Sequence, residues 1–149
     1  MKKIIFLIIS LVSMMFATTA SAIQGEGTEE SPFLITTQAE LETVSDFPTC
    51  HFKLENDIVL EGEWNALCDN GEAFSGVFDG NGYEISNLTT IVSQSPHEHD
   101  GIFAINSGII KRLKVKTSGE GLNSKGYYVG GIAAINRENG IITQCSFEG

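Results

Sequence analysis

A short repeated pattern, Gly-apolar-apolar-x-x-Asn, restricts the fold of this chain more than any other feature. The three copies are Gly76–Asn81, Gly101–Asn106 and Gly131–Asn136. Each copy leads through a Gly into a further apolar stretch. One such unit cannot bury its apolar side chains alone, so repeated units must stack and share a core. The pattern therefore predicts an all-β fold, a right-handed parallel β-helix (solenoid) of about three to four coils.

Stacking would place the asparagines of the three copies in register. Aligned asparagines can pass side-chain amide hydrogen bonds from one coil to the next, so we interpret them as structural residues and not as catalytic ones. The glycines supply the backbone freedom that sharp corners require. The residues expected to form turns or this ladder are Gly76, Asp79, Gly80, Asn81, Gly82, Gly101, Asn106, Gly131 and Asn136.

The segment before the repeats has a different pattern. Phe33–Ile35 is typical of a short strand, and Thr37 with Glu40 fits a capping box at the start of a helix. Leu41 and Val44 then lie on one helical face, which predicts a short helix near residues 38–45. A solenoid needs a cover at its open end, so we expect residues 23–50 to cap repeats that span 51–149. The first coil should be supplied by Phe52, Leu54, Ile58 and Leu60.

The N-terminus is typical of a bacterial signal peptide, residues 1–22. Lys2 and Lys3 precede an uncharged apolar run, Ile4–Ala17, and Ala20 and Ala22 fit a small-x-small cleavage site. The run is short for a membrane span, although a retained anchor is the alternative. We expect a protein that is secreted or held at the cell surface, with the periplasm as a further location.

The charge balance excludes some partners. Removal of Lys2 and Lys3 leaves seven basic side chains against nineteen acidic ones, a net charge of −12 with His neutral. Such a surface repels nucleic acid and anionic lipid. With no second long apolar run in the sequence, we expect neither nucleic-acid binding nor membrane insertion.

Three cysteines remain in an exported chain, where disulfides can form. The separation of Cys50 and Cys68 in the sequence is close to one coil, so it favours a bridge between neighbouring coils. A bridge of this kind would stabilise the fold by about 3 kcal/mol. Two buried thiols are the alternative. Cys145 is left over, either buried and free or paired with a partner outside this chain.

The sequence resembles GLUG-motif surface proteins over nearly the whole mature chain. The resemblance implies a β-helix of the kind found in bacterial surface proteins and adhesin-like passengers. Such proteins are usually long, so a truncated fragment of a longer surface protein is one hypothesis for this chain. The matching segments are Gly25–Thr28, Pro32–Thr37 with Leu41, Phe52–Leu60, Phe74–Leu88 (the most specific), Gly101–Phe103 and Val129–Ala133.

The densest cluster of ligand-type residues is His97, Glu98, His99 and Asp100. Its spacing differs from the zinc-protease pattern, and it follows a polar, Pro-containing segment, so we interpret it as an exposed loop, with a metal site as the alternative. The Asp79–Tyr83 segment resembles a calcium loop but lacks the acid at the twelfth position, where Thr90 stands, and is better explained as a turn. We expect no metal and no cofactor.

Enzymes on β-helices place several acids, or acids with Arg and Lys, on one face. Here the candidate acids are dispersed in the sequence, and Arg112–Lys116 alternates in the manner of a solvated strand face. We therefore expect no catalysis and interpret the chain as an extracellular binding or adhesion-type module for an unidentified protein or glycan. A polysaccharide lyase or hydrolase is the alternative. The acids considered are Asp57, Asp69, Asp79 and Asp100.

The last coil, Val129–Phe147, should leave apolar side chains open to solvent. Its backbone groups would also lack partners on one side, and exposed edges of this kind recruit other chains. We therefore expect the protein either to fray after about residue 126 or to associate with itself through this end. The apolar residues concerned are Ile132, Ile135, Ile141 and Phe147.

Overall fold

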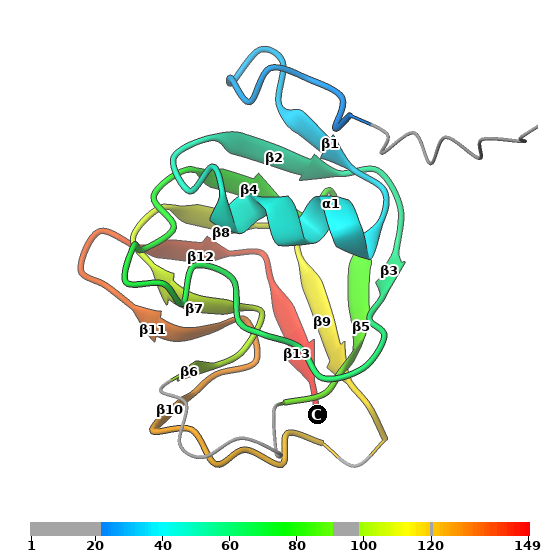
Figure 1. Ribbon diagram of the computed structural model, residues 1–149, viewed down its shortest axis with the longest axis vertical. Helices are drawn as coiled ribbons and strands as arrows, with labels where there is room; N and C mark the ends of the chain where they lie inside the picture. The colour runs from blue at the N-terminus through cyan, green and yellow to red at the C-terminus, as the bar shows by residue number, and fades with distance from the viewer. Residues whose placement is uncertain (1–21, 91–98, 120) are drawn as a thin grey trace, which may run out of the picture.

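Parallel β-strands dominate the structure. It is a computed structural model that describes residues 22–90, 99–119 and 121–149 (Figure 1). All pairs of named strands are parallel, which confirms the all-β class. The strands are β1 (Phe33–Ile35), β2 (His51–Leu54), β3 (Ile58–Val59), β4 (Val77–Asp79), β5 (Glu84–Leu88), β6 (His99–Asp100), β7 (Phe103–Asn106), β8 (Ile109–Lys111), β9 (Lys114–Thr117), β10 (Tyr128–Val129), β11 (Ala133–Asn136), β12 (Ile141–Thr143) and β13 (Ser146–Glu148).

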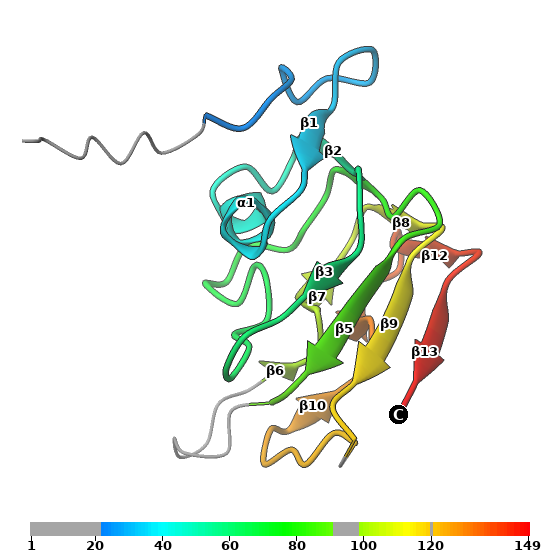
Figure 2. The same cartoon turned by 90° about the vertical axis from the view of Figure 1, so that its right-hand side faces the viewer.

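The described strands form four sheets. The largest sheet has the strand order β1-β2-β4-β8-β12. The second sheet has the order β3-β5-β9-β13, and its four strands lie side by side in Figure 2. Two smaller sheets pair β6 with β10 and β7 with β11. From β4 onward the chain visits the sheets in the same order on each return, β4 to β7 and then β8 to β11, before it reaches β12 and β13. Strands that are neighbours in the largest sheet are therefore separated in the sequence by a full return of the chain.

The core is a set of apolar rows that cross the stacked strands. In the largest sheet Phe52 pairs with Phe78, and Phe78 pairs with Ile110; all three are at most 1% exposed. Phe78 also contacts the ring of Phe103 edge-on, at a centroid distance of 5.3 Å. Full burial of each such side chain contributes about 1.5–3 kcal/mol to stability. These rows hold the sheets at a fixed separation and fix which side chains point outward.

The register of the repeats differs from the one predicted. The copy at Gly76 does not align with the copy at Gly101, because Val77 pairs with Ile109, and Ile109 with Ile141. The aligned glycines are therefore Gly76, Gly108 and Gly140, which are equally spaced in the sequence. A Cβ on Gly108 would lie 2.3 Å from the backbone oxygen of Gly76, so close stacking requires glycine here.

The predicted asparagine ladder is formed by two of its three members. Asn106 pairs with Asn136 in the β7–β11 sheet, and the side-chain amide of Asn106 donates to Asn136 Oδ1 at 2.7 Å. Asn81 lies elsewhere, at a corner with φ of 53°, and its amide donates to the Leu54 carbonyl. The expectation for Asn81 was wrong because the positive-φ corners, and not the asparagines, align in this part of the stack.

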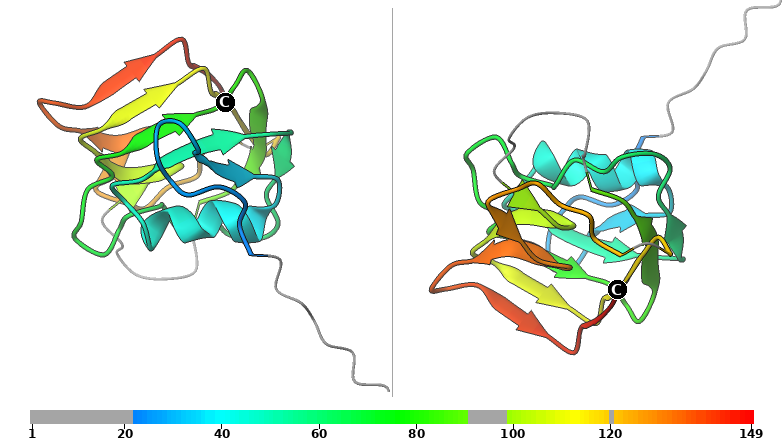
Figure 3. Two further views of the ribbon diagram at one scale, coloured as in Figure 1. Left: turned by 90° about the horizontal axis from the view of Figure 1, so that it is seen from above. Right: turned by 90° about the horizontal axis from the view of Figure 1, so that it is seen from below.

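The N-terminal segment covers one end of the stack. Helix α1 (Gln38–Glu42) begins with the predicted capping box of Thr37 and Glu40 and continues into a 3₁₀ turn, η1 (Thr43–Ser45). These elements confirm the predicted helix, and Leu41 and Val44 are fully buried against the core. In both views of Figure 3, α1 and the last strands lie on opposite sides of the molecule.

The predicted disulfide between Cys50 and Cys68 is not formed: all three cysteines are free thiols. The expectation failed because a full return of the chain to the same sheet is longer than the segment between these two cysteines. Cys50 directly precedes His51, which pairs with Val77, whereas Cys68 follows Leu67, which forms a bridge with Phe103 in a different part of the stack. Burial raises the pKa of the Cys68 thiol to about 11.

The predictions for residues 1–21, which include Ala20, lie outside the described residues, and Ala22 is exposed. Within the described part of the chain, neither helix is long and apolar enough to cross a membrane.

Candidate binding surface

The outer face of the largest sheet carries two straight rows of side chains. Side chains alternate along a strand, so residues next to the buried Phe52, Phe78 and Ile110 point outward. The register aligns these outward residues across β2, β4, β8 and β12. One row is His51, Val77, Ile109 and Ile141, and the other is Lys53, Asp79, Lys111 and Thr143.

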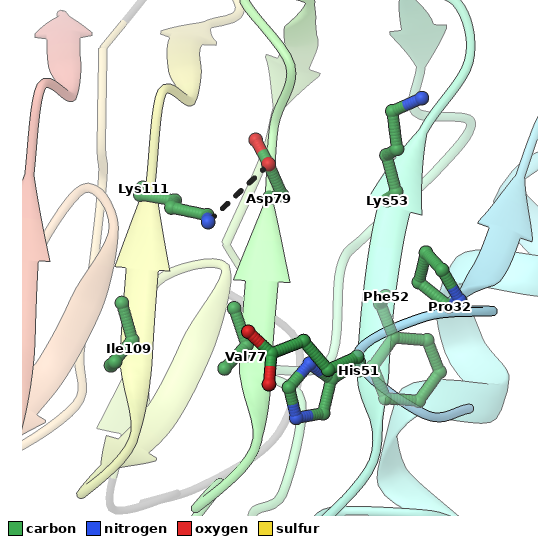
Figure 4. A pocket seen from close by; sticks show the side chains of 9 residues that line it. Pro32, His51, Phe52, Lys53, Val77, Asp79, Ile109 and Lys111 are labelled. Carbon is green, nitrogen blue, oxygen red and sulfur yellow. Dashed lines mark ion pairs between the residues drawn. The ribbon is translucent and has the colours of Figure 1, made fainter.

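A shallow cleft of about 210 Å³ lies over these rows. Figure 4 shows the side chains of His51, Val77 and Ile109 along one side of the cleft and the charged row along the other. The N-terminal segment before β1 contributes Glu29 and Pro32 to the rim. The cleft therefore presents apolar, imidazole and charged groups together, most of them held on strands of one sheet.

Asp79 has more hydrogen-bond and ion-pair partners than the lysines beside it in the charged row. Partial burial by itself would raise its pKa, but hydrogen bonds from Arg112 and the Asn81 backbone, with the charges of Arg112 and Lys111, lower the pKa below its usual range. The Arg112 guanidinium donates to both carboxylate oxygens, with Nε at 3.0 Å from Oδ1. The Asn81 backbone N–H donates to Oδ1 at 2.8 Å. Asp79 therefore stays ionised and links the corner at Asn81 to the corner at Arg112.

The charges of this face alternate in sign along the row. Lys53 lies beside Glu55 at 2.7 Å, and Lys111 lies 3.7 Å from the Asp79 carboxylate. The side chains of both lysines are about a third exposed or more, so water screens these pairs and each contributes little to stability. Their ammonium groups can exchange such partners for a ligand at small cost.

The predicted solvated face at Arg112–Lys116 is divided in the structure. Lys114 and Lys116 point outward from β9 while Val115 is buried, as the alternation predicts. Arg112 lies instead at a corner with φ of 53°, where it reaches back to Asp79. Sequence reasoning missed this pair because the two residues are 33 positions apart.

The prediction that the histidine cluster is an exposed loop was wrong for His99 and Asp100, which form β6 and are buried because other segments of the chain pack against them. His99 is 8% exposed; its Nδ1 contacts Asp69 Oδ1, and its ring stacks on Tyr128. Asp100 is buried and accepts a hydrogen bond from the Ser124 hydroxyl. His97 and Glu98, the other two members of the cluster, lie outside the described residues. Among those that are described, no group of three or more His, Cys, Asp or Glu side chains could hold a metal ion.

Gly80, Gly101 and Gly131 lie where segments of the chain approach closely, whereas Gly82 forms a turn in open space. A Cβ on Gly80 would lie 2.5 Å from Leu113 Cα, and one on Gly131 would lie 2.0 Å from the Phe147 ring. Gly82 has φ of 83°, and Gly101 follows β6 directly. Of the predicted turn and ladder residues, Asp79 alone lines the cleft. Val77 belongs to the repeated pattern, but no motif groups the cleft residues with one another; only the strand register does.

Comparisons with known proteins give two distant relatives. No family model and no solved structure matches the chain. A protein of Evansella cellulosilytica described as a Gly-rich membrane protein is 31% identical over 102 residues, 61% of this chain and 12% of the relative. Halomucin of Haloquadratum walsbyi is 33% identical over 95 residues, 53% of this chain and 1% of the relative. The chain therefore matches only a small part of either relative.

Proposed function

We propose that this chain is a non-catalytic extracellular binding or adhesion-type module, and that the outer face of the largest sheet is its binding surface. The observation that carries the proposal is the pair of straight side-chain rows with the cleft over them. Neighbouring strands lie about 4.8 Å apart, so each row presents its side chains at a constant interval. A repetitive extracellular polymer, a glycan, fits such a surface better than a small compact molecule does.

The form of the cleft supports a polymer ligand. Sites for small molecules are usually enclosed and have volumes of about 300–1,000 Å³. This cleft is smaller and open to solvent along the sheet. His51, Lys53 and Lys111 can form hydrogen bonds with sugar hydroxyls, while Val77 and Ile109 offer an apolar floor.

The state of Asp79 supports binding over catalysis. In most glycoside hydrolase families two carboxyl groups in set positions carry the reaction, and one of them must hold a proton. Asp79 is held ionised by Arg112, and its oxygens are already occupied by Arg112 and the Asn81 N–H. The other acid at the cleft, Glu29, comes from the N-terminal segment. We therefore assign Asp79 a structural role and retain lyase or hydrolase activity as the alternative.

The fold proposed for this module is a right-handed parallel β-helix. Four parallel sheets, which the chain visits in the same order from β4 onward, support the β-helix, and parallel crossovers are right-handed in nearly all proteins. The resemblance to GLUG-motif surface proteins, the signal-peptide pattern and the names of the two relatives support a location outside the cell or at its surface.

Binding to immobilised polysaccharides, neutral and uronic-acid-containing, tests the proposal. We expect at least one polymer to bind, and we expect Lys111→Gln and His51→Ala each to weaken that binding about tenfold. Lys114→Gln is the matched control, because Lys114 carries the same charge on β9, outside this sheet. Equal loss in the control, or release of shortened products from the polymer, would contradict the proposed function.

A further inference from the structure

Basic side chains gather at the cleft although the chain is strongly acidic. Residues 22–75 contain twelve acidic side chains but a single lysine, Lys53, and a single histidine, His51. Both lie on β2 and line the cleft. Lys111, on β8, lines the same cleft. Charges that only keep a protein soluble need no particular position, so this placement indicates a local role.

The acidic side chains nearest to the two lysines leave them able to bind an anion. Asp79 is bound at both oxygens by Arg112, which does not line the cleft. Lys111 Nζ lies 3.7 Å from that carboxylate, beyond hydrogen-bond distance. Lys53 pairs with Glu55, but both side chains are more than a third exposed, so water screens this pair. Each ammonium group has three N–H donors and can therefore turn to a ligand.

The strand register sets the spacing of the two lysines. Lys53 pairs with Asp79, and Asp79 with Lys111, so the three side chains follow one another across β2, β4 and β8 (Figure 4). Because neighbouring strands lie about 4.8 Å apart, the backbone positions of the two lysines are about 10 Å apart. A sugar ring advances an extended polysaccharide by about one strand spacing. A polymer laid across the strands therefore brings every second ring to a lysine, and the ring between them to Asp79.

The lysines and Asp79 select different groups on these rings. An ammonium group donates to a carboxylate in a charge-assisted hydrogen bond, which is roughly twice as strong as a neutral one. An ionised Asp79 can only accept, so the ring over it must present a hydroxyl and not a carboxylate. Val77 and Ile109, beside the charged row, offer apolar contacts to the C–H groups of the rings. Uronic acids that alternate with uncharged sugars carry these groups in this order.

We propose that the cleft binds a polysaccharide with a uronic acid at every second sugar, laid across β2, β4 and β8 so that one carboxylate contacts Lys53 and the next contacts Lys111. This inference rests on the proposed function, because it specifies the glycan that the same surface binds. The acidic side chains of the rest of the chain oppose unspecific adsorption of such a polyanion, so binding reports the cleft.

Calorimetric titration of the exported protein with two forms of one polymer tests the inference. Hyaluronan carries a uronate at every second sugar, and methyl esterification of its carboxylates removes the charge while it keeps the chain. We expect the ester to bind at least about tenfold more weakly, because the charge-assisted contacts to the lysines are lost. This comparison uses the unaltered protein and does not depend on the folding of a variant.

Single variants give a second readout. Lys53→Gln should weaken hyaluronan binding about tenfold and leave binding of the ester unchanged. Glu29→Gln should strengthen hyaluronan binding, because it removes a repelling carboxylate from the rim of the cleft. Lys114→Gln, outside this sheet, is the control and should change neither affinity.

The outcomes separate this inference from the proposed function. Equal affinity for hyaluronan and its ester would overturn the inference and leave glycan binding in place, and so would equal losses in Lys53→Gln and Lys114→Gln. Failure of both forms to bind would also overturn the inference. The proposed function fails with it only if the neutral polysaccharides do not bind either.

Discussion

Two identical substitutions in one row, Ile110→Ala and Ile142→Ala, test how the stack is built. Both residues lie in the largest sheet and are register partners on adjacent strands, β8 and β12. They differ in surroundings, since Ile110 is fully buried and Ile142 is 36% exposed. Any difference in their effects on stability therefore reports position in the stack and not residue chemistry.

The magnitudes follow from the methyl and methylene groups removed. Ile→Ala deletes three carbons, a transfer free energy of about 2.4 kcal/mol at about 0.8 kcal/mol each. At Ile110 the closed packing on both sides leaves a cavity, so we expect a loss of about 3–4 kcal/mol. At Ile142 about two thirds of the side chain is covered, and the open side leaves no cavity, so we expect about 1.5 kcal/mol.

Equilibrium unfolding in urea, monitored by circular dichroism, measures both losses. Dilute protein should be used, at a concentration where light scattering gives the mass of one chain, because association would stabilise the native state. Equal losses for the two variants would refute the reasoning, since the end of the stack would then be as closed as its middle.

Three further predictions concern single residues. Asp79→Asn should lower the free energy of unfolding at neutral pH, and its difference from the unaltered protein should shrink as pH falls below about 4. The reason is that the pKa of Asp79 is lowered in the folded state, so its stabilising contribution is lost when the carboxylate is protonated. Urea unfolding across pH measures this, with Asp46→Asn, at an exposed position, as the control. Gly108→Ala should destabilise strongly because the new Cβ meets the Gly76 oxygen, whereas Gly119→Ala meets nothing within 4 Å, and a comparable loss of melting temperature in both would contradict the register. Cys68 should react with iodoacetamide much more slowly than Cys50 in the folded protein, because Cys68 is buried and its pKa is raised to about 11. Mass spectrometry of samples taken over time measures the two rates, and equal rates would contradict the prediction.

The local elements were predictable because their signals are local. The capping box of Thr37 and Glu40 places the start of α1 within a single helical turn. The alternation of Lys114, Val115 and Lys116 predicts the two faces of β9 in the same way. The repeats predict parallel strands, because any stack of such units must add them in the same direction.

The register was not predictable from the pattern chosen. The corners of successive returns fall at Asn81, Arg112 and Gln144, each with φ of 53°. These three residue types differ, so no repeated residue in the sequence marks the corners. The aligned glycines at 76, 108 and 140 carry the true period, but a similar pattern at 101 and 131 belongs to another sheet.

The candidate binding surface could not be found without that register. His51 and Ile109 lie outside the three copies of the repeated pattern, and Val77 lies within one of them. The three residues become neighbours only when strands from successive returns of the chain are paired. The same is true of the ion pair between Asp79 and Arg112, which joins two successive returns.

The most direct test of the central claim is to map the bound polysaccharide by NMR on isotopically labelled protein. We predict that resonances of the outer face of β2, β4 and β8 shift on titration, with His51 and Lys111 among the most affected, while those of β9 and β13 stay in place. Shifts that cluster outside the largest sheet would contradict the account, as would shortening of the polymer during the titration.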